Sequence, residues 1–290
     1  MAVVRLAYKL VSGQANVIDL ARGLSLTERR LIHQKQVFTV MGGLLVDNKS
    51  PDSITGTLIK MSTAPNNFYT RNAVTRGFRA WKAMRKKMLE ADSSITTPKY
   101  SDFKVLLDNS NTNTYLNPHD AASTEMGDAE WEYSVISPEQ GVDKSFMIVG
   151  RDHTASRYSL ARGWLETRPV PNNVQPERAD LNADGVEDVN VDFLATMFQD
   201  TTEGTDGLNL IVDENDKHPY KLDELMTTQS AFDAAEPRNL QLQYVHHSNV
   251  NELSHPVPGF QALCGLIRVD VTGGSDPILI LDVETKGWNF

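Results

Sequence analysis

The sequence lacks the residues and segments on which several common protein classes depend. It has one cysteine, Cys264, which excludes an internal disulfide and any zinc site built from several cysteines, and which fits folding in a reducing cytoplasm. No apolar run approaches the roughly 18 residues of a membrane span. The first residues also lack the long apolar stretch of a secretory signal. We therefore expect neither export nor a membrane partner.

Signatures of catalysis are missing as well. The sequence contains no Gly-rich phosphate-binding loop and no Gly-x-Ser-x-Gly motif. Its seven histidines include no pair at a metal-ligand spacing, and the adjacent His246 and His247 would point to opposite faces of a strand. We therefore expect no catalytic residues and no enzymatic activity.

Charge is distributed unevenly along the chain, whose formal net charge is −10. Residues 1–90 hold 15 Lys and Arg against 5 Asp and Glu, whereas residues 91–290 hold 13 against 33. Two interpretations fit this asymmetry. Either the basic part faces a polyanion, or it neutralises the acidic remainder within the same subunit.

Short stretches rich in β-branched and aromatic residues predict most of the secondary structure. They are residues 36–46, 56–62, 102–108, 130–136, 144–149, 156–166, 240–246, 260–271 and 277–283. Many strands with few helices predict an all-β fold, specifically a single eight-stranded jelly-roll sandwich with one long helix and helical loop insertions. A double jelly roll would need nearly twice as many strands.

The domain organisation follows from the same pattern. Residues 1–35 are expected to form an N-terminal arm, with a short helix that begins at a capping box formed by Ser25 and Glu28. Residues 36–290 are expected to form the jelly-roll domain. Within it, residues 170–235 are rich in Pro, Asn and Asp and predict an insertion of surface or intersubunit loops.

The clearest helix runs from Arg71 to Ala91. An apolar stripe at helical spacing is expected to lie in the core rather than to stack on bases; its members are Val74, Phe78, Trp81, Met84 and Met88. Basic residues cover much of the rest, so the helix could face nucleic acid, a neighbouring subunit, or only solvent. The residues expected to contact nucleic acid or another subunit are Arg22, Arg29, Arg30, Arg76, Arg79, Arg85 and Lys86.

The segment from Asp180 to Asp192 matches the first half of an EF-hand calcium loop. Oxygen ligands occupy its first, third and fifth positions, and Gly185 occupies the sixth. Val191 stands at the twelfth position, where a carboxylate is needed, so a later or earlier Asp would have to complete the site. The candidate ligands are Asp180, Asn182, Asp184, Asp188 and Asp192. A solvated turn is the other interpretation, and no cofactor besides Ca²⁺ is expected.

Five segments spread over most of the chain carry a further pattern. They are ARGLSLTERRL (21–31), MSTAPNNFYTRNAVTRGFRAWKAM (61–84), YSDFKVLLD (100–108), EWEYS (130–134) and PGFQALCGLI (258–267). Together they resemble capsid proteins of environmental, often aquatic, small circular single-stranded DNA viruses. The resemblance implies a jelly-roll subunit that self-assembles into an icosahedral shell around a DNA genome. The chain departs from many such proteins in having no flexible Arg-rich N-terminal arm.

These observations predict a structural viral capsid protein, located in the virion and assembled in the host cell. Its expected partners are copies of itself and packaged single-stranded DNA. The alternative is a virion-associated or secreted carbohydrate-binding β-sandwich. That alternative needs an exposed aromatic platform, whereas Trp131, Trp164 and Trp288 are expected to be buried or terminal.

Overall fold

The computed structural model places all of the residues that it describes in one unit of the chain. The described residues are 2–47, 57–91, 100–108, 115–127, 131–136, 142–150, 156–166, 240–248, 254–273 and 276–285. The predicted insertion at 170–235, its calcium loop from Asp180 to Asp192, and Trp288 lie outside them. Among the described residues, no helix combines the length and the apolar character that a membrane crossing requires.

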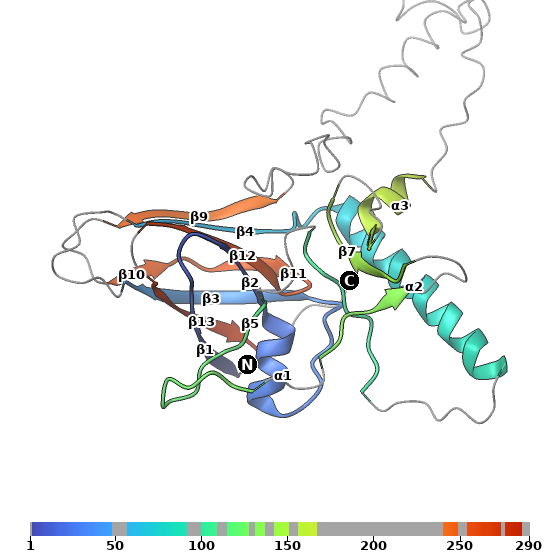
Figure 1. Ribbon diagram of the computed structural model, residues 1–290, viewed down its shortest axis with the longest axis horizontal. Helices are drawn as coiled ribbons and strands as arrows, with labels where there is room; N and C mark the ends of the chain where they lie inside the picture. Colours follow the sequence, from blue (N-terminus) through green and yellow to red (C-terminus); the bar gives the residue numbers. More distant parts are fainter. Residues whose placement is uncertain are drawn as a thin grey trace, which may run out of the picture. The chain divides into compact units, whose positions relative to one another are not determined.

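Two five-stranded sheets form the body of the unit (Figure 1). In the first, neighbouring strands are antiparallel and follow the order β1 (Val3–Lys9), β13 (Ile278–Glu284), β3 (Val37–Val46) and β10 (Ser254–Val257). Strand β11 (Phe260–Leu263) pairs with the first half of β3. The first and last strands of the chain are thus hydrogen-bonded neighbours.

The second sheet has the order β5 (Tyr115–Leu116), β2 (Ala15–Asp19), β12 (Leu266–Thr272), β4 (Thr57–Thr63) and β9 (Gln241–Ser248). Its pairs are antiparallel except for the short parallel pair of β2 with β5. A small third sheet contains β6 (Val135–Ile136), β7 (Lys144–Met147) and β8 (Arg157–Ser159). The helices among the described residues are α1 (Leu20–Glu28), α2 (Phe68–Ala91) and α3 (Leu160–Glu166).

One hydrophobic core fills the space between the two large sheets. Buried side chains alternate along the strands, as in β13, where Leu279, Leu281 and Val283 are completely buried. They pack in a single cluster with Ile59 and Met61 from the other sheet. The described part of the chain is therefore mostly β-sheet with few helices, built as a two-layer sandwich, as the sequence predicts at this level.

The prediction of an N-terminal arm over residues 1–35 is wrong. Strand β1 pairs with β13 and β2 pairs with β12, so both belong to the sandwich. Leu6, Tyr8 and Leu10 are almost completely buried in its core. Strand β1 has only seven residues without strict alternation of apolar and polar side chains, so it gives little local signal, and its partner lies about 270–280 residues away.

The predicted capping box is also wrong. Helix α1 begins directly after β2, with Asp19 as its N-cap. Ser25 lies inside the helix and its hydroxyl donates to the carbonyl of Ala21 at 2.7 Å. The helix ends at Glu28, and its C-cap is Arg29, whose backbone is left-handed with φ 52°.

Three of the predicted strands differ in the structure. Residues 102–108 contribute only an isolated bridge at Leu106, and residues 130–136 contribute only β6. Residues 156–166 form the short strand β8 followed by helix α3, because Leu160, Ala161 and Trp164 bury one helical face. The Trp164 ring packs edge-on against Tyr69 of α2, with ring centroids 4.5 Å apart.

The predicted strand at 260–271 is divided into β11 and β12. A tight turn between them carries the chain from the first sheet to the second, and Gly265 N donates to Ala262 O at 3.2 Å. Cys264 and Gly265 both have positive φ. A Cβ atom at Gly265 would lie 2.9 Å from the ring of Phe38, so only glycine fits there without movement of the ring.

Helix α2 includes the predicted range 71–91, but its apolar stripe is not buried throughout. Val74 is buried and Phe78 and Trp81 are half-buried, whereas Met84 and Met88 are 48% and 65% exposed. Figure 1 shows the helix running away from the sandwich. The prediction of a core position is therefore wrong for the two methionines, because the packed aromatic side chains reach only the first half of the helix.

The alternation in β3 provides a direct test of the sandwich. Leu45 is completely buried and its neighbour Leu44 is 38% exposed. We expect Leu45→Ala to lower the free energy of unfolding by about 2–5 kcal/mol, because it leaves a cavity in the core. The matched Leu44→Ala should cost about 0.5 kcal/mol or less. Chemical denaturation of both variants measures the difference, and equal losses would contradict the register of β3.

Candidate functional site

Five of the seven residues predicted to contact nucleic acid or another subunit line two neighbouring pockets. Arg22, Arg29 and Arg30 line the smaller pocket, of about 200 Å³. Arg85 and Lys86 line the larger pocket, of about 550 Å³. Arg76 and Arg79 are exposed on α2 but line neither pocket. The two pockets share a wall, because residues 100–104 contribute side chains to both.

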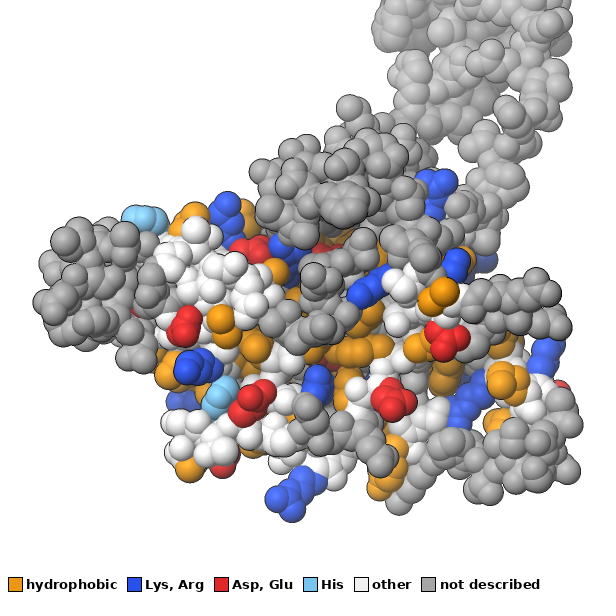
Figure 2. Space-filling model, in the orientation of Figure 1, with side chains coloured by type: hydrophobic (Ala, Val, Ile, Leu, Met, Phe, Trp, Pro, Cys, Tyr) orange, Lys and Arg blue, Asp and Glu red, His pale blue; other side chains and the backbone are white. Residues whose placement is uncertain are grey.

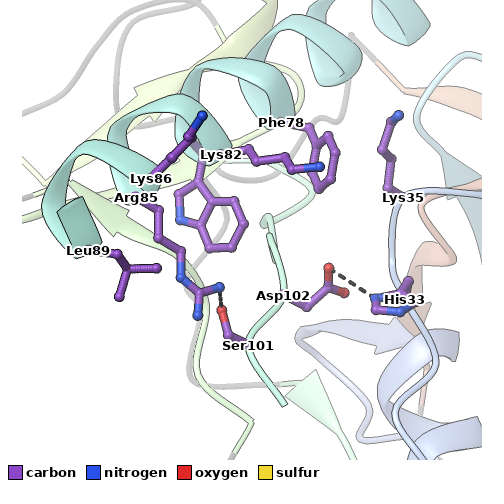
Figure 3. A pocket seen from close by; sticks show the side chains of 10 residues that line it. His33, Lys35, Phe78, Lys82, Arg85, Lys86, Leu89, Ser101 and Asp102 are labelled. Carbon is purple, nitrogen blue, oxygen red and sulfur yellow. Dashed lines mark hydrogen bonds and ion pairs between the residues drawn. The ribbon is translucent and has the colours of Figure 1, made fainter. Parts of the chain in front are cut away.

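Helix α2 forms one side of the larger pocket (Figure 3). The helical residues that line it follow spacings of three and four, and so share one face of the helix; they are Phe78, Trp81, Lys82, Arg85, Lys86 and Leu89. The opposite side comes from two distant segments, with His33 and Lys35 after α1 and Ser101 and Asp102 after α2. Figure 2 shows Lys and Arg side chains beside hydrophobic ones on the surface over this helix.

Aromatic rings form the apolar wall of the larger pocket. Phe78 and Trp81 stack with ring centroids 6.3 Å apart, and Trp81 packs on Phe103 at 5.7 Å. Phe103 in turn packs on the buried Phe146, with ring centroids 5.3 Å apart, and this contact anchors the wall to the small sheet. Trp81 was expected to be a core residue; it packs on the core and also lines the pocket.

Cations lie over these rings. The Lys35 ammonium is 4.7 Å from the centroid of Phe78, and the Arg85 guanidinium is 5.3 Å from that of Trp81. Each such contact contributes about 0.5–1 kcal/mol at an exposed site. Arg85 also donates to the hydroxyl of Ser101, while its Nη2 is buried and has no acceptor among the described residues.

The larger pocket is electropositive. Its described lining includes four cationic side chains, Lys35, Lys82, Arg85 and Lys86, against the single carboxylate of Asp102. Asp102 is already engaged by Nδ1 of His33 at 3.2 Å. Lys86 lies 3.6 Å from Glu90, but both side chains are exposed and such pairs are weak. The pocket is therefore suited to an anion that also carries a flat apolar group.

The smaller pocket also combines cationic side chains with an aromatic ring. The ammonium of Lys104 lies 4.2 Å from the centroid of the Trp131 ring, and both residues line the pocket. Burial lowers the pKa of Lys104, although the charge of Asp102 opposes this shift. Arg22, Arg29 and Arg30 surround the same hollow, and Arg30 lies 3.7 Å from Glu28.

The buried carboxylate of Asp19 holds together the segments that form both pockets. Its Oδ1 accepts hydrogen bonds from the backbone N–H groups of Ala21 and Arg22, at 3.0 and 3.2 Å. Its Oδ2 accepts from Nε2 of Gln34 at 3.1 Å and from the hydroxyl of Tyr133 at 3.2 Å. Burial raises the pKa of Tyr133, so this hydroxyl stays protonated as a donor.

Two further contacts fix the segment at 100–108. The side-chain amide of Gln34 pairs with the backbone of Val105 as a neighbouring strand would. It accepts a hydrogen bond from Val105 N at 2.6 Å and donates one to Val105 O at 3.0 Å. At the other end, Nη1 of the buried Arg268 lies 3.2 Å from Oδ2 of Asp108. The segment that forms the wall shared by the two pockets is thus bound to Gln34, after α1, and to Arg268 of β12.

Several site residues could not be selected from the sequence. Lys82 was detectable, because it precedes Lys86 by four positions on the same helical face. His33, Lys35, Ser101 and Asp102 carry no local signal and reach the pocket only through the fold. The candidate calcium ligands lie outside the described residues, and within those residues no group of three or more His, Cys, Asp or Glu could hold a metal.

No protein-family model, curated protein or solved structure matches the chain. Its function is therefore inferred from the strand order and from the chemistry of the pockets.

The Asp19 network should give stability a characteristic pH dependence. Burial raises the pKa of Asp19 from 3.8 to about 6, although its hydrogen bonds and Arg22 oppose the shift. Because the pKa is raised in the folded state, the carboxyl contributes most to the stability of the fold below pH 3.8, where it is protonated. This contribution is lost as the pH rises through 6. Relative to Asp19→Asn, the free energy of unfolding of the wild type should fall by up to about 3 kcal/mol over this range.

Urea denaturation between pH 4 and 7 measures this difference. The control is Asp282→Asn, because Arg5 holds the pKa of Asp282 below its usual value by a hydrogen bond and by charge. The contribution of Asp282 should therefore be lost as the pH falls, which is the opposite direction. If the free energy of unfolding of the wild type instead rises relative to that of Asp19→Asn as the pH increases, the assignment of a raised pKa to Asp19 is wrong.

Proposed function

We propose that this chain is a structural viral capsid protein, whose copies assemble into an icosahedral shell around the genome. It would act without catalysis, with other copies of itself as its main partner, and would be found in the virion after assembly in the host cell. The observation that carries the proposal is the strand order of the sandwich, taken together with the five segments that resemble capsid proteins of small circular single-stranded DNA viruses.

The strand order supports a single eight-stranded jelly roll. When β10 and β11 are counted as one strand, the sandwich strands can be numbered 1 to 8 along the chain, with β9 as strand 5. The first sheet then has the order 1-8-3-6, and the second has the order 2-7-4-5 beside the short β5. The neighbours 1·8, 2·7, 3·6 and 4·5 are those of one long antiparallel ribbon rolled into two layers.

The jelly roll is shared by capsid proteins, lectins and cupins, so the fold alone does not decide among them. The long excursion between strands 4 and 5 favours a shell protein. It leaves β4 at Thr63 and returns at Gln241, and it carries α2, the small sheet and α3. Such an excursion supplies surface for subunit contacts without disturbing the sandwich core.

The carbohydrate-binding alternative has less support. A sugar-binding platform needs an accessible aromatic face, but Trp164 is only 6% exposed. Trp131 lies beneath the ammonium of Lys104. A glycan array would test this alternative directly.

Assembly is the decisive measurement. We expect the purified chain to form uniform closed particles in negative-stain electron microscopy at low or moderate salt. If calcium binds the loop from Asp180 to Asp192, particle yield should rise with calcium, and Asp184→Asn should abolish that response without preventing assembly. A monodisperse monomer under every condition would argue against a shell protein.

A further inference from the structure

We infer that the larger pocket binds single-stranded nucleic acid, with a base against the Trp81 and Phe78 wall and neighbouring phosphates bound by Lys82, Arg85 and Lys86. This inference deepens the proposed function, and it rests on that proposal for the identity of the natural ligand as packaged DNA. The pocket chemistry itself does not depend on assembly.

The charge of the pocket favours a polyanion. Four cations line the pocket against a single carboxylate in its described lining, that of Asp102, so positive charge is in excess. Lys and Arg bind phosphates and release the condensed counterions. The buried Nη2 of Arg85 has no acceptor among the described residues, and a phosphate oxygen would supply one.

The rings favour a polyanion that carries bases. Phe78 and Trp81 are half-buried, so part of each ring faces the pocket. A volume of about 550 Å³ lies in the range of pockets that take small organic ligands, and is therefore large enough for a base with its sugar. A carboxylate-rich surface of a second copy would satisfy the cations but would place nothing flat against the rings.

A single strand fits this arrangement better than a duplex. The bases of a duplex are stacked on one another, whereas an unpaired base can lie against an aromatic side chain. The smaller pocket lies across the wall at 100–104 and offers Arg29 and Arg30 as further phosphate ligands. Tyr100, which is 64% exposed, lines that pocket and provides a second ring.

The test is the affinity of the unassembled chain for a fluorescent oligonucleotide of about ten thymidines, measured by anisotropy at about 50 and 200 mM salt. Replacing Lys82 and Lys86 by Gln should weaken binding about tenfold and reduce its salt dependence. The matched control replaces Arg79 and Lys87 by Gln. These residues are exposed on the same helix but do not line the pocket, and the control should change affinity by less than about twofold.

The role of the ring is tested separately. Trp81→Leu should weaken oligonucleotide binding about fivefold or more and leave the salt dependence unchanged. Because Trp81 also packs on Phe103, Trp81→Phe provides a variant that keeps a ring and should keep affinity within about twofold. Heparin, a polyanion without bases, should bind with no dependence on Trp81.

Three results would overturn the inference. One is an equal loss of affinity in the Lys82/Lys86 and Arg79/Lys87 variants, which would mean diffuse attraction to the whole helix. Another is full oligonucleotide affinity in Trp81→Leu. The third is a Lys82/Lys86 variant that binds oligonucleotide normally but no longer forms particles, because the pocket would then be a subunit contact.

These outcomes are distinct from a failure of the proposed shell. Particles that form while the pocket binds no oligonucleotide would overturn the inference and leave the capsid proposal standing. Oligonucleotide binding that depends on Trp81, in a chain that never forms particles, would support the inference and overturn the capsid proposal.

Discussion

The carboxylate of Asp19 lies where the sandwich meets the segments that build the pockets. Asp19 is the last residue of β2 and the N-cap of α1, and its carboxylate accepts hydrogen bonds from the side chains of Gln34 and Tyr133. A buried charge is costly unless hydrogen bonds replace the lost water, and four donors surround this one. The same donors fix the positions of the chain on either side of the pockets, so the geometry of the surface depends on a group inside the fold.

The larger pocket combines features that are unfavourable in an ordinary protein surface. Cations are held close together on α2 and beside it, with few carboxylates in reach, and aromatic rings remain partly exposed. Cation–π contacts from Lys35 and Arg85 offset part of this cost. Mutual repulsion of the cations remains, and an anionic ligand would relieve it.

Local sequence patterns predicted several elements well. Strands β3, β4, β9 and β13 and helix α2 lie within a few residues of the predicted ranges. Each is long, with a clear period and with turn residues or charge at its ends. The pattern was less informative where short elements follow one another, as in β8 and α3, because three residues of strand and seven of helix do not establish a period.

The candidate site was predictable only in part. Basic residues on α2 and near α1 could be selected by composition, and Arg85, Lys86, Arg22, Arg29 and Arg30 do line pockets. The pairing of His33 with Asp102 and the position of Lys35 over Phe78 could not be predicted. These contacts join residues that lie between about 40 and 70 positions apart in the chain.

The sequence alone therefore specifies the strands β3, β4, β9 and β13, the basic amphipathic helix and the excess of positive charge in the first ninety residues, because each depends on residues close together in the chain. Tertiary structure decides that the first strand pairs with the last, which carries residues 3–9 into the core rather than into an arm. It also decides which cations surround which rings. Periodicity reports that one face of an element will be buried, but not which distant segment will cover it, since that choice depends on packing across the whole fold.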